Sequence, residues 1–489
     1  MMDAHSRYRS MLSLRDPFLD RARICAGLTI PSLYPEEGTE GQSLYVPEQG
    51  LGARGVKNLA SKLLLGLFPP NQAFFRLTIT DAELNAELKA NEKVEVERNL
   101  MRYERVVRAS LNKKYLRLKL YQVLRLLIVG GNALLYKKTN GFRVFRLDSY
   151  VVSRLDDGTI DEAIIREIVP KNRIPEGIVL TGIDVSPEGD KSVYLYTVVK
   201  HTAKGMDIHQ EIDGQKVPKS ERSYADDEAP FVCLRMNAVD GEDYGRSYVE
   251  EHVGDLYNYE ALSGSINKIT AAISRLIWLV DPNSSTNVRT LNKALDGEFI
   301  SGKREDIQAL MIEKNADLSA LMQRSNTLAD DLKKSFMLME GVQRAGERVT
   351  AEEIRRLAGD LETTLGGAYS LFSEELQLPI VRITLAEAVA SKAVQKLPQG
   401  IEPVVITGID AMGNAAELSK LNAFINQLAP LGQDVISQYL NVNDYMNRVA
   451  VATNLDIEGL IKTQDEVNAQ NQQAMEQQTA QQVAGNVIK

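Results

Sequence analysis

A stretch of helical periodicity from about Ser247 to Leu279 limits most strongly what this chain can fold into. Its apolar residues recur at spacings of three and four, which is typical of one face of an α-helix. A helix of about 33 residues would be a rod of about 50 Å, longer than the usual helix of a globular domain. A second helical pattern, from about Leu318 to Met339, follows a short segment with turn signals. We therefore expect two long helices joined by a small module.

A third long helical pattern begins at Thr350. Thr350 and Glu353 form a capping box, in which the Thr hydroxyl can accept from the N–H of Glu353 while the carboxylate reaches back. The apolar stripe continues for about 45 residues, with bends expected at Gly366-Gly367 and Pro379, and Leu397-Pro398 ends it. The residues before Thr350 then form a loop between two helices.

The first half of the chain mixes helix and strand. A helix is expected from Ala53 to Phe68, because Pro69-Pro70 must end it, and a longer one from about Asp81 to Val129. From Asn132 to about Leu234, short β-branched and aromatic runs alternate with turn dipeptides, a pattern that predicts an antiparallel sheet. The predicted fold class is α+β, predominantly α.

Composition and charge exclude several classes of function. Lys and Arg number 57 against 66 for Asp and Glu, a net charge of −9, which argues against a general nucleic-acid-binding surface. The chain has 2 Cys, too few for a disulfide framework or a Cys-rich zinc site, and a reducing compartment fits best. We expect no export signal and no transmembrane segment, because every apolar stretch falls below the ~18 residues of a spanning helix.

No pattern of residues indicates catalysis. The run from Gly297 to Lys303 resembles a phosphate-binding loop, but Arg304 stands where a Ser or Thr would hold Mg²⁺ and no buried strand precedes it. We interpret it as an ordinary turn. The 4 His residues lack metal-ligand spacing, and no G-x-S-x-G elbow occurs. We therefore expect no enzyme activity, no cofactor and no metal.

Five motifs occur in a fixed order and carry a family resemblance. They are TIPSLYP, GARGVKNLASKLLLGLFPP, GGNALLY, GEDYGRSYVEEHVGDL and GERVTAEEIRRLAGDLETTLGGAYSLFSEELQLPIVR, and the resemblance that they carry covers roughly Arg21 to Val405, most of the chain. In this set the chain resembles the head-to-tail connector, or portal, proteins of short-tailed bacteriophages (podovirus type). The resemblance implies a structural subunit of a dodecameric ring at one capsid vertex, through which double-stranded DNA is packaged and ejected.

The resemblance also implies names for the segments. These are an N-terminal α/β wing (1–243), a first stem helix (244–280), a clip (281–317), a second stem helix (318–340), a channel loop (341–349), a long kinked wing helix and strand (350–410), crown helices (411–463) and a Gln-rich tail (464–489). The composition of the last segment cannot support a packed core, so it is a flexible tail or a solvated helix.

Two groups of residues are the candidate sites. The family places the loop at the narrowest part of the channel, so Arg344 and Arg348 would face DNA, Glu347 would moderate their attraction, and Gly341 and Gly346 would let the loop move. From the residues alone, this loop could equally be an exposed connection between helices. In the clip, the basic residues expected to dock partner proteins are Arg289, Lys293, Lys303 and Arg304.

The implied partners are other copies of the chain, double-stranded DNA, the terminase packaging motor, a tail adaptor, the capsid and scaffolding proteins, and internal core proteins at the crown. The implied location is the virion, after assembly in the bacterial cytoplasm. Two alternatives stay open: an elongated helical scaffolding or tail protein without a DNA channel, and a nucleotide-binding enzyme that uses the turn at Gly297 to Lys303.

Overall fold

The computed structural model describes most of the chain, with gaps. The described residues are 3–36, 39, 41–69, 74–78, 90–113, 116–138, 141–175, 178–180, 192–226, 228–274, 278–283, 287–309, 315–338, 351–392, 394, 404–407, 414–428, 430, 440, 442, 445, 446 and 449. The chain divides into two compact units. The first comprises Met1–Lys62, Leu118–Asp226 and Cys233–Gln343, and the second Leu63–Arg117, Asp227–Val232 and Arg344–Lys489.

A six-stranded antiparallel sheet forms the largest part of the first unit. Its strands follow the order β4-β5-β6-β7-β8, and β9 also pairs with β7. In register, Tyr150 of β4 faces Ile165 of β5. The strands are β4 (Tyr150–Arg154), β5 (Ile160–Pro170), β6 (Ser192–Thr202), β7 (Gly205–Ile212), β8 (Gln215–Lys216) and β9 (Arg222–Tyr224).

A second sheet has the order β10-β2-β3, with β2 (Asn132–Lys138), β3 (Gly141–Phe145) and β10 (Phe231–Arg235). Glu167 of β5 forms ion pairs with Lys138 of β2, at 2.9 Å, and with Arg143 of β3. The antiparallel sheet predicted for residues 132–234 is therefore confirmed. The turn at Asp213-Gly214 has positive φ at both residues (51° and 75°), which is the geometry of a tight hairpin.

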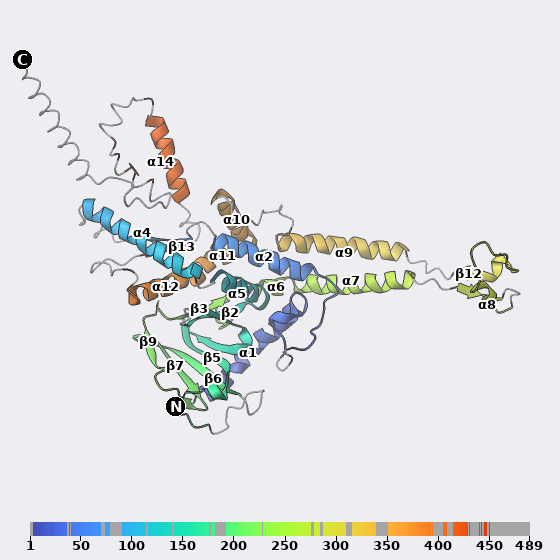
Figure 1. Cartoon of the computed structure of the whole chain (residues 1–489), viewed down its shortest axis with the longest axis horizontal. Helices are drawn as coiled ribbons and strands as arrows, with labels where there is room; N and C mark the ends of the chain where they lie inside the picture. Colours follow the sequence, from blue (N-terminus) through green and yellow to red (C-terminus); the bar gives the residue numbers. More distant parts are fainter. Residues whose placement is uncertain are drawn as a thin grey trace, which may run out of the picture. The chain divides into compact units, whose positions relative to one another are not determined.

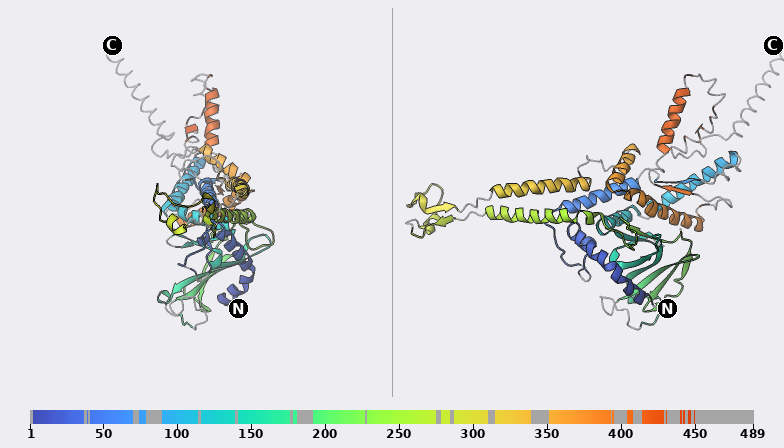
Figure 2. Two further views of the ribbon diagram at one scale, coloured as in Figure 1. Left: turned by 90° about the vertical axis from the view of Figure 1, so that its right-hand side faces the viewer. Right: turned by 180° about the vertical axis from the view of Figure 1, so that it is seen from behind.

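Helix α1 (Ala4–Gly27) packs on the larger sheet and was missed by the sequence analysis. Its residues Ala4 and Tyr8 join Ile164 and Val198 of the sheet in one buried cluster, so the helix covers that face (Figure 2). Pro17 lies inside the helix, and charged residues interrupt its apolar positions. These two features hide the helical period in the sequence.

The helix expected from Ala53 to Phe68 is confirmed as α2 (Leu51–Leu67). The single helix expected from Asp81 to Val129 is wrong: the structure has two helices, α4 (Ala90–Lys113) and α5 (Leu116–Gly130). Between them, residues 114 and 115 lie outside the described residues. A short 3-10 turn, η1 (Pro31–Leu33), follows α1, and η2 (Leu147–Ser149) and η3 (Lys171–Arg173) flank β4 and β5.

Helices α7 (Val253–Ile273) and α9 (Asn315–Ser335) lie side by side (Figures 1 and 2). The single rod predicted from Ser247 to Leu279 is too long, because α6 (Tyr248–Glu251) is separate and Trp278–Val280 forms strand β11. At 1.5 Å per residue, the 21 residues of α7 make a rod of about 32 Å. The apolar pattern of Trp278 and Leu279 suits a strand as well as a helix, so periodicity alone could not place this boundary.

A small module connects α7 to α9. Strand β11 (Trp278–Val280) pairs with β12 (Ile307–Ala309), and α8 (Val288–Leu291) and η5 (Arg304–Asp306) lie between them in sequence. The segment expected at 281–317 therefore begins with β11, earlier than predicted. After the turn at Gly297, the chain forms a 3-10 turn and a strand, which is not the strand-loop-helix order of a phosphate-binding loop.

The second unit contains the kinked helix expected after Thr350. It consists of α10 (Ala351–Thr364), α11 (Ala368–Phe372), the π-helical turn η6 (Ser373–Gln377) and α12 (Leu378–Ala390). Gly366 and Gly367 both have positive φ, which confirms the first bend. The expected end at Leu397 is several residues too late. Strand β13 (Val404–Thr407) pairs with β1 (Phe75–Thr78), and α14 (Asn414–Leu428) follows.

Candidate functional site

The predicted channel loop lies outside the described residues. This applies to all of its candidate residues, Gly341, Arg344, Gly346, Glu347 and Arg348, and to the capping residue Thr350. Their roles stay predictions. The structure does describe the chain that leads into this loop, at the end of α9, and the chain that follows it, from α10 onward.

Helix α9 ends in a Schellman motif. The N–H of Leu338 donates to the carbonyl of Lys333 at 2.7 Å, and the N–H of Met337 donates to that of Lys334 at 2.9 Å. Met337 occupies the left-handed position, with φ of 54°, where glycine is usual. Its side chain is nevertheless buried. Packing therefore holds a methionine in a backbone conformation that it adopts at a cost of about 1 kcal/mol.

Two polar side chains of α2 hold this end of α9. The Asn58 amide donates to the carbonyls of Phe336 and Met337, at 3.0 and 3.1 Å. The Lys62 ammonium donates to the Met337 carbonyl at 2.9 Å, although its side chain is buried in an apolar stretch of helix. A cation and an amide donor both suit carbonyls at the C-terminal end of a helix, because these carbonyls lack an intrahelical hydrogen-bond donor. Neither residue is among the sites predicted from the sequence.

The ring of Phe336 lies against the same helix. A Cβ on Gly55 would approach Phe336 to 2.6 Å, so only glycine fits at that position. On other sides the ring meets Tyr248 and His252, with centroids 5.8 and 5.7 Å away. Burial in this cluster lowers the pKa of His252, which favours the neutral imidazole.

In the second unit, three side chains donate hydrogen bonds to carbonyls at the C-terminal end of α2. The Tyr369 hydroxyl donates to the carbonyl of Gly66 at 2.9 Å, and the fully buried Gln377 amide donates to that of Leu67. The Arg117 guanidinium donates to the carbonyl of Phe68. Tyr369 lies in α11 and Gln377 in the π-helical turn, so the chain after the predicted loop supplies two of these three donors.

The helix pair α7 and α9 exposes apolar surface. Across α7, every residue of which is described, only Leu256 is buried. Tyr257 is 66% exposed, and Ile273 is also exposed. A cavity beside the two helices is lined by polar and apolar side chains of both, among them Asn267, Ile266 and Met322, and by residues 48–50 of the preceding loop. Much of the surface of α7 thus stays accessible in the described chain.

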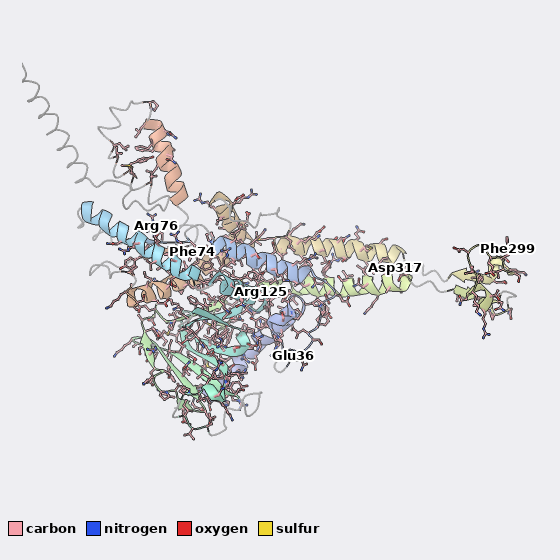
Figure 3. All side chains as sticks on the ribbon, viewed as in Figure 1. Glu36, Phe74, Arg76, Arg125, Phe299 and Asp317 are labelled. Atoms are coloured by element: carbon pink, nitrogen blue, oxygen red, sulfur yellow. The ribbon has the colours of Figure 1, made fainter. Side chains whose placement is uncertain are left out.

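The predicted basic residues of the module are exposed where they are described. Arg289, Lys293 and Lys303 lie at the surface, and the side chain of Arg304 falls outside the described residues. Beside them the module exposes large apolar side chains, and Phe299 is fully exposed (Figure 3). The docking residues predicted from the sequence are the charged ones only. The apolar residues exposed on the module are Leu279, Val288, Leu291, Leu295 and Phe299.

Titratable side chains of the described residues can be compared with the requirements of metal binding and nucleophilic chemistry. Within them, no group of three or more His, Cys, Asp and Glu could hold a metal ion. Burial raises the pKa of the Cys25 thiol to about 11, so this sulfur is a poor nucleophile at neutral pH. His209 contacts Glu211 at 2.9 Å, and the same carboxylate accepts from the N–H of Ala4, which ties α1 to the sheet. No helix in the described part of the chain is long and apolar enough to cross a membrane.

Comparisons with known proteins give one consistent result. The sequence model of the family "Bacteriophage head to tail connecting protein" matches residues 2–460. The portal protein of Escherichia phage T7 is 37% identical over 98% of this chain and 91% of its own length. That of Enterobacteria phage T3 is 37% identical over 95% of this chain and 89% of its own length, and that of Pseudomonas phage phiKMV is 32% identical over 96% and 94%.

Among solved structures, a chain from the neck of an empty gene transfer agent particle superimposes with a TM-score of 0.36 and 11% identity. The alignment covers 78% of this chain and 86% of that one. Because this superposition is loose, the comparison of sequences carries the assignment.

Proposed function

Because the chain belongs to the bacteriophage head to tail connecting protein family, we propose that it is the portal subunit of a short-tailed bacteriophage. The observation that carries this proposal is the similarity along nearly the whole chain to portal proteins of two such phages, at 37% identity. A portal subunit is a structural protein rather than an enzyme. It occupies one vertex of the capsid in the virion, and its ring, a dodecamer in our proposal, is the conduit for double-stranded DNA.

The exposed surface of α7 and α9 supports assembly into a ring. A helix that buries only Leu256 within its own described chain leaves an apolar face for another molecule. In a ring, each subunit presents one face to the next and a different face to the previous subunit, and rotation closes the assembly. We propose that these two helices form the stem of the portal and pack on the stems of neighbouring copies.

The charge of the chain supports a conduit rather than a tight DNA-binding protein. DNA must slide during packaging, and a net charge of −9 avoids dense phosphate pairing along the channel. We propose that Arg344 and Arg348 of the channel loop provide local, salt-screened attraction, moderated by Glu347, and that Gly341 and Gly346 allow the loop to move. Replacing both arginines with alanine should give normal rings in particles that package poorly or lose DNA. Particles that fill and retain DNA normally would reduce the loop to a connection between helices.

The position of the module between α7 and α9 supports the proposal that it docks other proteins. Its two strands connect helices that run antiparallel, so it lies at the end of the pair remote from Phe336. We propose that this module is the clip and that Arg289, Lys293, Lys303 and Arg304 contact the terminase motor and the tail adaptor. Capsid, scaffolding and internal core proteins are further proposed partners, the last at the proposed crown (411–463), a range that includes α14 (Asn414–Leu428). Assembly in the bacterial cytoplasm is part of the same proposal.

Negative-stain electron microscopy of the purified full-length protein tests the main proposal. We expect rings with a central opening. Elongated particles without an opening would favour a scaffolding or tail protein. ATP hydrolysis by the purified chain, lost in Lys303→Ala but retained in the matched variant Lys293→Ala, would favour the nucleotide-binding alternative.

A further inference from the structure

The loop of residues 42–50, which precedes α2, lies as a strap along α7. The Glu260 carboxylate of α7 accepts from the Tyr45 hydroxyl at 2.6 Å. It also accepts from the backbone N–H groups of Glu48 and Gln49, at 2.8 and 3.3 Å. These contacts hold the strap on the helix before any other molecule binds to it, which lowers the entropic cost of binding through the strap.

The outward side of the strap combines apolar surface with negative charge. Tyr45 and Val46 are 61% and 80% exposed. Glu48 is exposed as well, and its carboxylate accepts from the neutral Asn267 amide at 3.1 Å. Among the described residues, no cation pairs with Glu48. We call Tyr45, Val46 and Glu48 the strap face.

The outer face of α5 carries the opposite charge. This helix contains no acidic residue along its whole length. Leu118, Tyr121 and Arg125 follow one another at spacings of three and four residues, so they lie on one face of the helix. Leu118 is 61% exposed, and the Arg125 guanidinium lies 4.9 Å from the centre of the Tyr121 ring (Figure 3). We call these three residues the α5 face.

Arg125 has no counter-charge in the described part of the chain. Its Nε is buried without a hydrogen-bond partner there, and its contact is with the ring of Tyr121. Native proteins satisfy nearly all buried donors of this kind. Because the side chain is only half-buried, a carboxylate of another molecule can reach the guanidinium, and such pairs form strong, charge-assisted hydrogen bonds.

A protein suits the α5 face better than nucleic acid does. Tyr and Arg are enriched among the residues that carry most of the binding energy in protein interfaces, and the exposed Leu118 would gain nothing from a phosphate. With 66 Asp and Glu against 57 Lys and Arg, another copy of this chain offers carboxylates in excess. The strap face offers one of them beside two apolar side chains, which complements the α5 face in charge and in apolar character.

We propose that the strap face of one copy docks on the α5 face of the next copy, where Glu48 pairs with Arg125. Both faces belong to the first compact unit, and they share no residue. A closed ring needs two different, complementary faces on each subunit, which these two faces provide. The contact rests on the proposed ring, and it continues the proposed stem contact because the strap follows α7.

Charge reversal at both residues, singly and together, tests the contact in the full-length protein. Arg125→Glu and Glu48→Arg should each weaken the association of subunits by at least about tenfold, because an ion pair becomes a like-charge pair. The double variant restores an ion pair of the opposite orientation and should recover most of the loss. Arg9→Glu, at an exposed position of α1, is the matched control and should assemble like the wild type. Analytical ultracentrifugation over a range of concentrations measures all four.

Single variants that assemble like the wild type would overturn the proposal. A double variant that assembles no better than the single ones would do so too, because Glu48 would not be the partner of Arg125. Arg125→Met removes the charge, keeps an aliphatic chain over Tyr121, and replaces the reversal if that variant does not fold. It should weaken association and leave the urea midpoint of dissociated subunits unchanged. A lower midpoint would place the counter-charge within the same chain, against the proposal.

DNA binding and electron microscopy separate this contact from other outcomes. If Arg125→Met left association unchanged but weakened the binding of a DNA duplex to the rings, the α5 face would bind nucleic acid instead. Wild-type rings with unchanged association of the single variants would overturn the contact and leave the portal function standing. Wild-type particles without a central opening would refute the portal function, whereas loss and recovery of association would still show that copies meet through these two faces.

Discussion

Helices α2 and α7 are similar in length and unlike in what surrounds them. α2 has 17 residues and α7 has 21. In α2, the residues buried by the chain itself include Leu51, Val56, Leu59, Ala60, Leu63, Leu64 and Leu67. In α7, whose residues are all described, only Leu256 is buried. The single chain therefore buries much of α2 and leaves most of α7 accessible.

The glycines of the two helices show the same difference. Gly55 and Gly66 of α2 are close to the aromatic rings of Phe336 and Tyr369. A Cβ on Gly254 of α7 would meet nothing within 4 Å, and one on Gly264 would meet only Glu48. Along α2 the glycines let two aromatic rings of the same chain approach closely, whereas along α7 the described chain leaves Gly254 open and places only Glu48 near Gly264.

The largest expected effect on the stability of the subunit comes from the core beside α2. Leu59 is fully buried, so Leu59→Ala should lower the free energy of unfolding by about 2–5 kcal/mol through lost burial and a residual cavity. Leu118→Ala, at a position that is 61% exposed, is the matched control, and should change it by less than about 0.5 kcal/mol. Urea unfolding of dissociated subunits measures both. Equal midpoints for the two variants would remove the distinction between a packed region and an exposed one.

A buried carboxyl group in the packed region should make the stability of the chain depend on pH. Glu104 of α4 accepts from the N–H of Leu77 at 2.7 Å in the second unit, and burial raises its pKa to about 7. Between its ordinary value and about 7, the folded chain binds more protons at this group than the unfolded chain does. Stability should therefore decrease as pH rises through this window, by at most about 3 kcal/mol.

The variant Glu104→Gln measures this contribution. It removes the titration and should flatten the pH dependence of the urea midpoint between about pH 4.5 and 7. A slope that is the same in the wild type and in Glu104→Gln would show that folding does not raise the pKa of Glu104.

The packed region could be predicted from the sequence to a large extent. The period and the Pro69-Pro70 stop placed α2 within two residues at its start, and the turn dipeptides indicated the antiparallel sheet. Lys62 could not be recognised, because a lysine in a helix is usually exposed and its partner, the carbonyl of Met337, is distant in sequence. Likewise, Pro17 and scattered charges concealed α1.

The exposed region was harder to predict because few of its side chains are buried within the described chain. Periodicity indicated both long helices but extended the first into β11, since Trp278 and Leu279 suit either structure. The charges of the module were found, whereas Phe299 and Leu295 were missed. Both are large apolar residues in a short, turn-rich segment that has no core to bury them. This pattern in the sequence could have identified them. The roles of the loop residues came from the family resemblance alone.

The smallest effect on the subunit is expected at Tyr257 of α7, and this prediction distinguishes the two helices most sharply. Tyr257 is 66% exposed, so Tyr257→Ser should change the free energy of unfolding of dissociated subunits by less than about 0.5 kcal/mol. In the ring, a tyrosine buried between neighbouring stems would contribute more than about 1 kcal/mol to each contact. The substitution should therefore shift the equilibrium from rings toward subunits at a given concentration.

The matched control is Val179→Ser, at an equally exposed apolar residue outside the helix pair. Analytical ultracentrifugation over a range of protein concentrations should show weakened rings for Tyr257→Ser and wild-type rings for Val179→Ser. If both variants assemble like the wild type, α7 does not contact its neighbours through Tyr257. If Tyr257→Ser instead destabilises the isolated subunit as much as Leu59→Ala, its partner lies within the same chain, and the contrast between α2 and α7 is lost at that position.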